Sequence, residues 1–221
     1  MNQHKKTFKA LVGSLFPVQL AEMTYPTDPN GKNTVYIEPM DNVREPNVIF
    51  QEIEKDYMEL DGVFTLFPSQ ERQHGHRVLN VAIEIKTNLK DLKKDHKMVY
   101  YLGTTDLFFL VVPYGLIPDA IRKIRSFGER IPYFGLVEAT SGEIVIMPAM
   151  QDAIKDKDRE SRVLAKIYLT KRRVERPEAC YLVRSLELGT HRRPEFVSLA
   201  GMNVNRDYFK VVSNALPEDP L

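Results

Sequence analysis

An acidic and a basic residue stand two positions apart in the apolar segment VAIEIKT, as Glu84 and Lys86. Side chains alternate along a strand, so Val81, Ile83 and Ile85 would face one way and the two charged residues the other. A carboxylate and an ammonium on an otherwise apolar strand are costly unless they meet water, each other or a ligand. The pair therefore predicts a cleft at this strand.

A second carboxylate would lie beside Glu84 if this strand forms one arm of a hairpin. The preceding strand-like segment is MELDGVFTLF, and a polar stretch from Pro68 to Arg77 separates the two arms. In a hairpin centred on that stretch, two residues that lie opposite each other should have residue numbers that sum to about 145. The numbers of Asp61 and Glu84 meet this condition. Carboxylates about 5 Å apart repel each other by about 3 kcal/mol at an effective dielectric constant of about 20. A divalent cation would turn this repulsion into binding energy.

These residue types suit metal-dependent hydrolysis of phosphodiester bonds. Asp61, Glu84, the backbone carbonyl of Ile85 and several waters match the oxygen ligands that Mg²⁺ (or Mn²⁺) prefers. The cation would neutralise a phosphate oxygen and lower the pKa of a bound water. Lys86 would orient that water or stabilise the transition state. Asp61, Glu84 and Lys86 are thus the candidate catalytic residues.

The acid-x-lysine spacing is not specific by itself. Asp91 with Lys93 and Asp95 with Lys97 repeat it, but in a predicted helix, whereas only the pair in VAIEIKT lies on a predicted strand. The simplest alternative for that pair is a salt bridge on the face of the strand.

The periodicity of the flanking segments predicts an α/β fold with a mixed sheet between helices. Strands are expected at 47–53, 58–67, 77–87 and 105–113, with two more around a tight TSGE turn within 133–149, and helices at 88–103 and 118–130. Asn88 is the expected N-cap of the first helix and Gly103 its end. TDLFFLVVP predicts a strand buried on both faces and parallel to its neighbour.

The same signals divide the chain into three parts. Residues 1–47 read as an irregular lead-in with a short helix and one short strand, TVYIEP. Residues 48–150 form the core, in which the sheet is expected to end near residue 149. Residues 151–221 are expected to be a mostly helical extension packed on the core.

These residues resemble the pattern of the PD-(D/E)xK nuclease superfamily, with an acid in LDGVF, acid-x-lysine in IEIK, and then a helix and a buried strand. The text VAIEIKTNLKDLKKDHKMVYYLGTTDLFFLVVP, followed by YFGLVEATSGEIVIMPA, is similar to the MmcB-like DNA-repair proteins. The resemblance covers roughly Glu52 to Ala149. It implies a restriction-endonuclease-like fold and a role in DNA metabolism, such as repair or defence, and it is compatible with a homodimer.

This sequence departs from the superfamily pattern at two places. The superfamily often adds a glutamate from a helix before the hairpin, for which Glu45, Glu52 and Glu54 are candidates, with Glu52 retained as the additional acid. The proline that gives the motif its name is absent before Asp61.

Cationic and aromatic side chains recur along one side of the helix predicted after the acid-x-lysine pair, and these candidate nucleic-acid contacts are Lys90, Lys93, Lys94, Lys97 and Tyr101. Such side chains could bind the phosphate backbone of DNA without reading its sequence. The alternative is an ordinary solvated helix face, balanced by Asp91 and Asp95.

Composition sets the outer limits of these hypotheses. The chain has 221 residues, of which 43% are hydrophobic, enough for one well-filled domain. A formal charge of +1 excludes general electrostatic attraction to nucleic acid, so any attraction must be local. A single cysteine suits the cytoplasm, and no run of eighteen apolar residues predicts a membrane span.

Three hypotheses follow. In the first, the chain is an Mg²⁺-dependent deoxyribonuclease. In the second, it is a catalytically inactive nuclease-like domain that binds nucleic acid or a protein. In the third, Asp61 and Glu84 lie far apart in an unrelated α/β domain.

Overall fold

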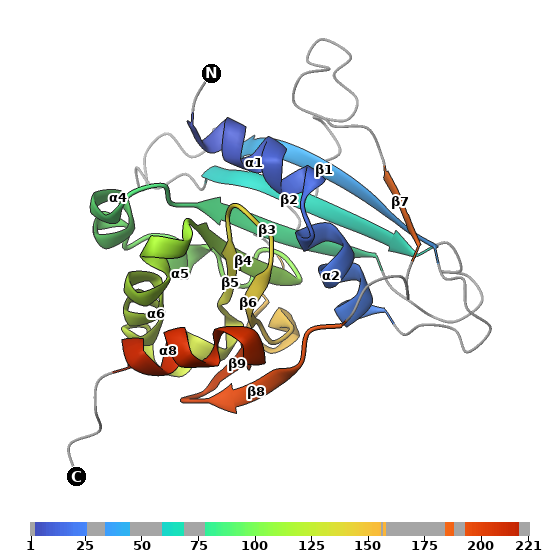
Figure 1. The fold of residues 1–221 in the computed structure, drawn as a ribbon. Helices are drawn as coiled ribbons and strands as arrows, with labels where there is room; N and C mark the ends of the chain where they lie inside the picture. Colours follow the sequence, from blue (N-terminus) through green and yellow to red (C-terminus); the bar gives the residue numbers. More distant parts are fainter. Residues whose placement is uncertain are drawn as a thin grey trace, which may run out of the picture.

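The computed structural model describes residues 3–25, 34–44, 59–68, 78–155, 157, 184–187 and 193–216. The strand predicted at 47–53, which contains Glu52, and most of the extension predicted to be helical beyond residue 155 lie outside these ranges. The described residues form a mixed α/β fold in which one sheet lies between two layers of helices (Figure 1).

Within the described residues the sheet has nine strands in the order β7-β1-β2-β3-β4-β5-β6-β9-β8. Their bounds are β1 Thr34–Arg44, β2 Glu59–Pro68, β3 Leu79–Ile85, β4 Leu107–Val112, β5 Gly135–Glu138, β6 Ile144–Met147, β7 Arg184–Glu187, β8 Phe196–Leu199 and β9 Met202–Asn205. Strand β4 runs parallel to β3 and β5, and the other pairs are antiparallel.

Two apolar cores cover the two faces of the sheet. One face packs against α1 (Gln3–Gly13) and α2 (Phe16–Thr24), and the other against α4 (Leu89–Lys94), α5 (Met98–Tyr101), α6 (Ile117–Arg125) and α8 (Phe209–Ala215). Short 3₁₀ turns complete the connections, at η1 (Tyr114–Leu116), η2 (Gly128–Tyr133), η3 (Gln151–Ile154) and η4 (Arg206–Tyr208). Alternate residues of β3 and β4 serve opposite cores, as the side-chain alternation of a doubly covered strand requires.

The central predictions about the sheet are confirmed. In the β2–β3 hairpin Gly62 pairs with Ile83 and Leu66 with Leu79, which is the register that the midpoint of the loop predicted. Every residue of β4 is buried, and β4 is parallel to both neighbours. Strands β5 and β6 form an antiparallel pair around the TSGE turn.

The helix predicted at 88–103 is wrong in its middle. Asn88 does cap it, because its side chain accepts a hydrogen bond from the N–H of Asp91, and Gly103 has a positive φ of 79°. However, α4 ends at Lys94 and α5 begins only at Met98, because Asp95 adopts an extended backbone. The helix predicted at 118–130 likewise ends at Arg125 and gives way to η2.

The sheet also extends beyond the predicted core. Strand β6 is not an edge, since β9 pairs with it and β8 pairs with β9. Strand β7 lies within a predicted helical segment but pairs with β1. Strands β7, β8 and β9 were not predicted, and most of the extension that was predicted to be helical lies outside the described ranges. Short strands with mixed polar faces carry little periodicity from which to predict them.

The N-terminal lead-in is more regular than predicted. A second helix, α2, follows α1, and the short strand TVYIEP is the first part of the eleven-residue β1. Leu20 and Phe16 of α2 are fully buried against the sheet, so burial stabilises this helix despite the glycine, serine and proline that precede or begin it.

Candidate active site

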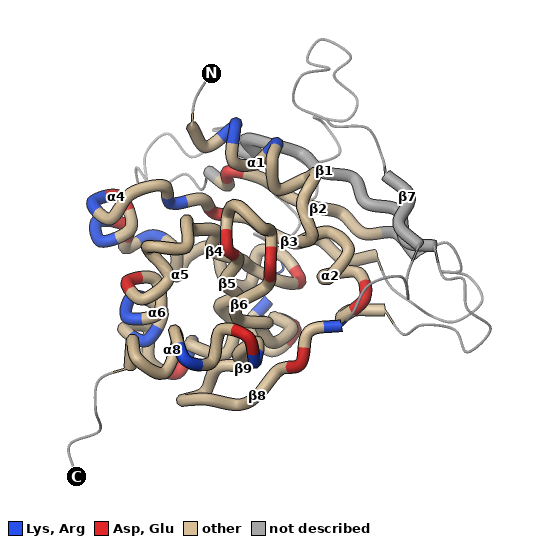
Figure 2. Tube along the Cα trace, in the orientation of Figure 1, with Lys and Arg blue, Asp and Glu red and all other residues tan. Residues whose placement is uncertain are grey.

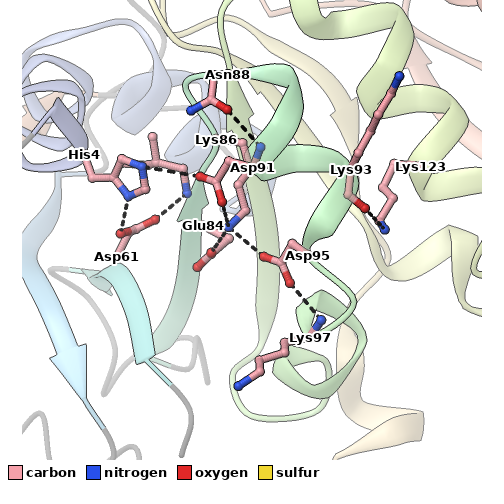
Figure 3. Close-up of polar contacts among 11 residues, drawn as sticks. His4, Asp61, Glu84, Lys86, Asn88, Asp91, Lys93, Asp95, Lys97 and Lys123 are labelled. Carbon is pink, nitrogen blue, oxygen red and sulfur yellow. Dashed lines mark hydrogen bonds and ion pairs between the residues drawn. The ribbon is translucent and has the colours of Figure 1, made fainter.

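The candidate site lies where β3 ends, at the carboxyl edge of the parallel strands (Figure 3). Glu84 is the second-last residue of β3, and Lys86 is the first residue after the strand. The backbone N–H of Lys86 donates a hydrogen bond to the carbonyl of Val111 in β4. Both side chains point to the same side, as alternation predicts. Lys86 Nζ lies 2.7 Å from Glu84 Oε1, and both side chains are less than a tenth exposed.

Lys86 has a second close carboxylate partner. Asp95 Oδ2 lies 2.6 Å from Lys86 Nζ, and Asp91 Oδ1 lies 3.8 Å from it. Both acids come from the segment that was predicted as one helix. Because α4 stops before Asp95, the side chain of Asp95 turns toward the end of β3, while its other oxygen accepts the N–H of Lys97 at 2.8 Å. The break in the helix thus completes the site.

Asp61 joins the site from β2. The last backbone pair of the hairpin is Gly62 with Ile83, and beyond it Asp61 Oδ2 accepts the N–H of Ile85 at 2.8 Å. A side-chain oxygen therefore takes the place of a backbone carbonyl where the strands part. The other oxygen, Oδ1, lies 3.0 Å from Nδ1 of His4, whose Nε2 lies 3.8 Å from Asp91.

The N-terminal helix brings His4 to this place. On α1, Phe8, Leu11 and Val12 are buried against the sheet. A Cβ at position 62 would collide with the ring of Phe8, so Gly62 lets the helix approach β2 closely. The packing of Phe8 on Phe64, with ring centroids 5.3 Å apart, fixes the helix that carries His4.

The electrostatic surroundings of Glu84 favour its protonated form. Burial, and next the negative charge of Asp61, raise the pKa of Glu84 to about 8, although the ammonium of Lys86 opposes this shift. Burial by itself would lower the pKa of Lys86, but the carboxylates of Glu84 and Asp95 outweigh burial and raise it. Within the described part of the chain, Oε2 of Glu84 is buried and accepts no hydrogen bond.

The oxygen atoms gathered at this site are of the kind that a hard cation prefers. Four acidic side chains, those of Asp61, Glu84, Asp91 and Asp95, lie around one lysine and one histidine, so acids outnumber bases at the site. Asp61 and Glu84 would hold the cation, Ile85 offering its backbone carbonyl, and the buried oxygen of Glu84 has a lone pair to donate. Among the described residues no three His, Cys, Asp or Glu side chains form a ready metal site, so waters would supply the remaining ligands.

The acidic and the basic side chains on and directly after α4 point in different directions. Asp91 and Asp95 turn toward Lys86 and His4, whereas the lysines of α4 are exposed: Lys90, Lys93 and Lys94. Within the described ranges these three lysines make no ion pair, and Figure 2 shows basic residues along α4 and α6. Asp91 and Asp95, which were expected to balance the charge of these lysines, thus lie near Lys86 and His4 instead.

One predicted nucleic-acid contact is wrong. Tyr101 is 7% exposed and packs against Phe108, with ring centroids 6.0 Å apart, so it belongs to the core. Its neighbour Tyr100 is 53% exposed instead. The break at Asp95 rotates α5 relative to α4, which is why a stripe drawn on one continuous helix selected the wrong tyrosine. Lys97 is exposed, as predicted.

The sequence did not identify three of the side chains that meet here, His4, Asp91 and Asp95. Asp91 and Asp95 were interpreted as helix surface, and His4 lies 57 residues before Asp61. A local signal existed only for the acids, since DLKKD places them four residues apart on one helix face, which is the face that meets Lys86.

Comparison with known proteins assigns the chain to no family. No family model matches the chain, and no curated protein matches it. A solved structure of a protein of unknown function from Silicibacter pomeroyi is similar to 80% of this chain and 92% of its own, with 14% identity and a TM-score of 0.44. That likeness is too weak to support an argument. No helix among the described residues is long and apolar enough to cross a bilayer. DNA binding, a homodimer and a cytoplasmic location stay predictions.

Proposed function

We propose that this protein is a metal-dependent nuclease that hydrolyses phosphodiester bonds in DNA, on a restriction-endonuclease-like fold. The observation that carries the proposal is the buried carboxylate of Glu84. It has one oxygen on Lys86 and one without a partner among the described residues, and it lies beside the engaged carboxylate of Asp61. Leaving a buried carboxylate oxygen unpaired is costly, and a cation ligand would remove that cost.

Each residue of the site has a role in such a reaction. A bound Mg²⁺ or Mn²⁺ would neutralise a phosphate oxygen and lower the pKa of a water. Asp61 and Glu84 would hold the cation, with His4 and the N–H of Ile85 fixing the orientation of Asp61. The ammonium of Lys86 would stabilise negative charge that develops on the phosphate.

The exposed lysines of α4 support a polyanionic substrate. Lys90, Lys93 and Lys94 lie on the helix that also supplies Asp91 to the site. A phosphate backbone that follows this helix would pass close to the end of β3, and contacts of this kind position nucleic acid without reading its bases. We therefore expect binding with little sequence preference and strong salt dependence.

A second candidate function is a catalytically inactive domain that binds nucleic acid or a protein. It is favoured by the engagement of both oxygens of Asp61 and by the placement of Lys86 between two carboxylates. In this alternative the charged groups stabilise the end of the hairpin and recruit no cation.

Calorimetric titration with Mn²⁺ and Mg²⁺ distinguishes the two. The wild type is compared with Glu84→Gln, which removes the charge at nearly constant volume, and with Asp119→Asn, which removes an acid from the exposed side of α6. Each protein is then incubated with supercoiled plasmid and with single-stranded DNA. Binding and cleavage by the wild type and Asp119→Asn, lost in Glu84→Gln, would support the nuclease. No cation binding by the wild type would favour the inactive domain.

A further inference from the structure

Asp95 lies outside the predicted motif, yet it makes the shortest ion-pair contact in the site. Its Oδ2 lies 2.6 Å from Lys86 Nζ, compared with 2.7 Å for Glu84. The side chain of Asp95 is 9% exposed. Its Oδ1 accepts the N–H of Lys97, so both oxygens of this carboxylate are fixed. Asp95 is therefore held at both oxygens, although it lies in a break between two short helices.

The contact between Asp95 and Lys86 matters because Glu84 would interact with two positive charges, the ammonium of Lys86 and a cation. Under the proposed function Glu84 binds a cation through Oε2 while its Oε1 lies on Lys86, so the cation and the ammonium repel each other and share the charge of one carboxylate. A buried ammonium that loses its partner is strongly destabilised. Asp95 reaches Lys86 from the side of α4, whereas Asp61 reaches the backbone of β3 from β2 (Figure 3). Of the two close partners of Lys86 among the described residues, Glu84 would be shared with a cation and Asp95 would not.

We propose that Asp95 is a positioning residue that holds the ammonium of Lys86 when Glu84 engages a cation. This inference rests on the proposed function, in which Glu84 binds a cation. The double anchoring of Lys86 can nevertheless be tested with no cation present, so the two ideas can fail separately.

The first measurement is the ¹H–¹⁵N signal of the Lys86 ammonium in the cation-free protein, because such signals are seen only where burial and ion pairs slow proton exchange. The signal should persist in Glu84→Met, which leaves Asp95 in place, and should be lost in Glu84→Met/Asp95→Asn. The control Glu84→Met/Asp119→Asn should keep it. Loss of the signal in Glu84→Met alone would overturn the proposal, since Asp95 would then not hold Lys86.

The second measurement is Mn²⁺ affinity in a double-mutant cycle. Asp95→Asn leaves Lys86 with Glu84 as its close partner, so the ammonium competes harder and Mn²⁺ affinity should fall about tenfold. In the Lys86→Met background Asp95→Asn should have little effect, and Asp95→Glu should restore part of the affinity of the wild type. An equal loss in both backgrounds would mean that Asp95 acts on the cation directly, which would contradict the proposal.

Failure of the proposed function has a different signature. If the wild-type protein binds no Mn²⁺, the nuclease proposal is wrong, and the ammonium signal alone then decides whether Asp95 anchors Lys86. A signal that depends on Asp95 only when Glu84 is replaced is the result that we expect in either case.

Discussion

A carboxylate beside a lysine normally ionises more readily, but Glu84 behaves in the opposite way. Burial and the charge of Asp61 raise its pKa to about 8 in spite of Lys86. The raised pKa means that the folded protein holds a proton that the unfolded chain releases near the ordinary value of 4.5. Glu84 thus introduces a local cost to folding, which its proposed role as a cation ligand would explain.

The pH dependence of stability tests this shift. Between about pH 5 and about pH 8 the unfolded state binds fewer protons at Glu84 than the folded state, so the free energy of unfolding should fall as pH rises. Glu84→Gln should lack this component, and we expect the difference between the two proteins to change by an amount on the order of 2 kcal/mol. Urea unfolding with a chelator present measures it. Parallel pH profiles for the two proteins would contradict the prediction.

At the scale of elements, the short helix α4 has two faces with different tasks. Asp91 of α4 and Asp95, directly after the helix, point to the end of β3, whereas the lysines of α4 point to solvent. Its orientation depends on the cap at Asn88, whose side chain accepts the N–H of Asp91 at 2.9 Å. A six-residue helix has little stability of its own, so this cap and the buried side chain of Leu92 hold it in place.

Removing the cap should loosen α4. Asn88→Ala is expected to lower the free energy of unfolding by about 1 kcal/mol and to speed hydrogen exchange at the amides of α4. Asn88→Ser should retain most of the stability, because serine also caps helices. If the serine variant were as unstable as the alanine variant, the cap would not be the cause.

The lysines of α4 should contribute to DNA affinity through charge alone. Lys90→Gln/Lys94→Gln should weaken binding to all sequences alike and reduce the slope of log affinity against log salt by up to about 2. The matched control, Arg206→Gln/Lys210→Gln, removes two exposed cations from η4 and α8. Fluorescence anisotropy over a series of salt concentrations measures both. Equal losses in the two variants would show that α4 has no special role.

At the scale of the whole molecule, the sheet joins the two ends of the chain into one unit. Strand β9 continues the sheet from β6, and Val212 and Ala215 of α8 enter the same core as Ile121 and Ile124 of α6. The segment from β8 to α8 is therefore part of the structural unit that supports the site.

Truncation tests this unity. A chain of residues 1–150 would expose the edge of β6 and the apolar side of α6, and we expect it to lose cooperative unfolding in urea. A chain that ends at Leu216 keeps the contacts of β9 and α8 and is the control. A cooperative transition and dispersed NMR spectrum for residues 1–150 would contradict the prediction.

The sequence by itself determined the features whose causes are local. Alternation placed Glu84 and Lys86 on one face of β3, the loop midpoint set the register that brings Asp61 near them, and Asn88 marked the start of α4. An unbroken apolar run identified β4 as a strand buried on both faces. These features depend on side-chain direction, hairpin geometry and capping, which act over a few residues.

Only the tertiary structure decided which side chains complete the site. His4 reaches Asp61 because α1 packs on β2 over Gly62, a contact between segments far apart in the chain. Asp95 reaches Lys86 because the helix stops there, although DLKKDHK contains no glycine or proline that would end a helix. The ion pair with a buried lysine and the core contact of Tyr101 outweigh the small helix propensities, and energies of that kind depend on neighbours that a local pattern does not contain.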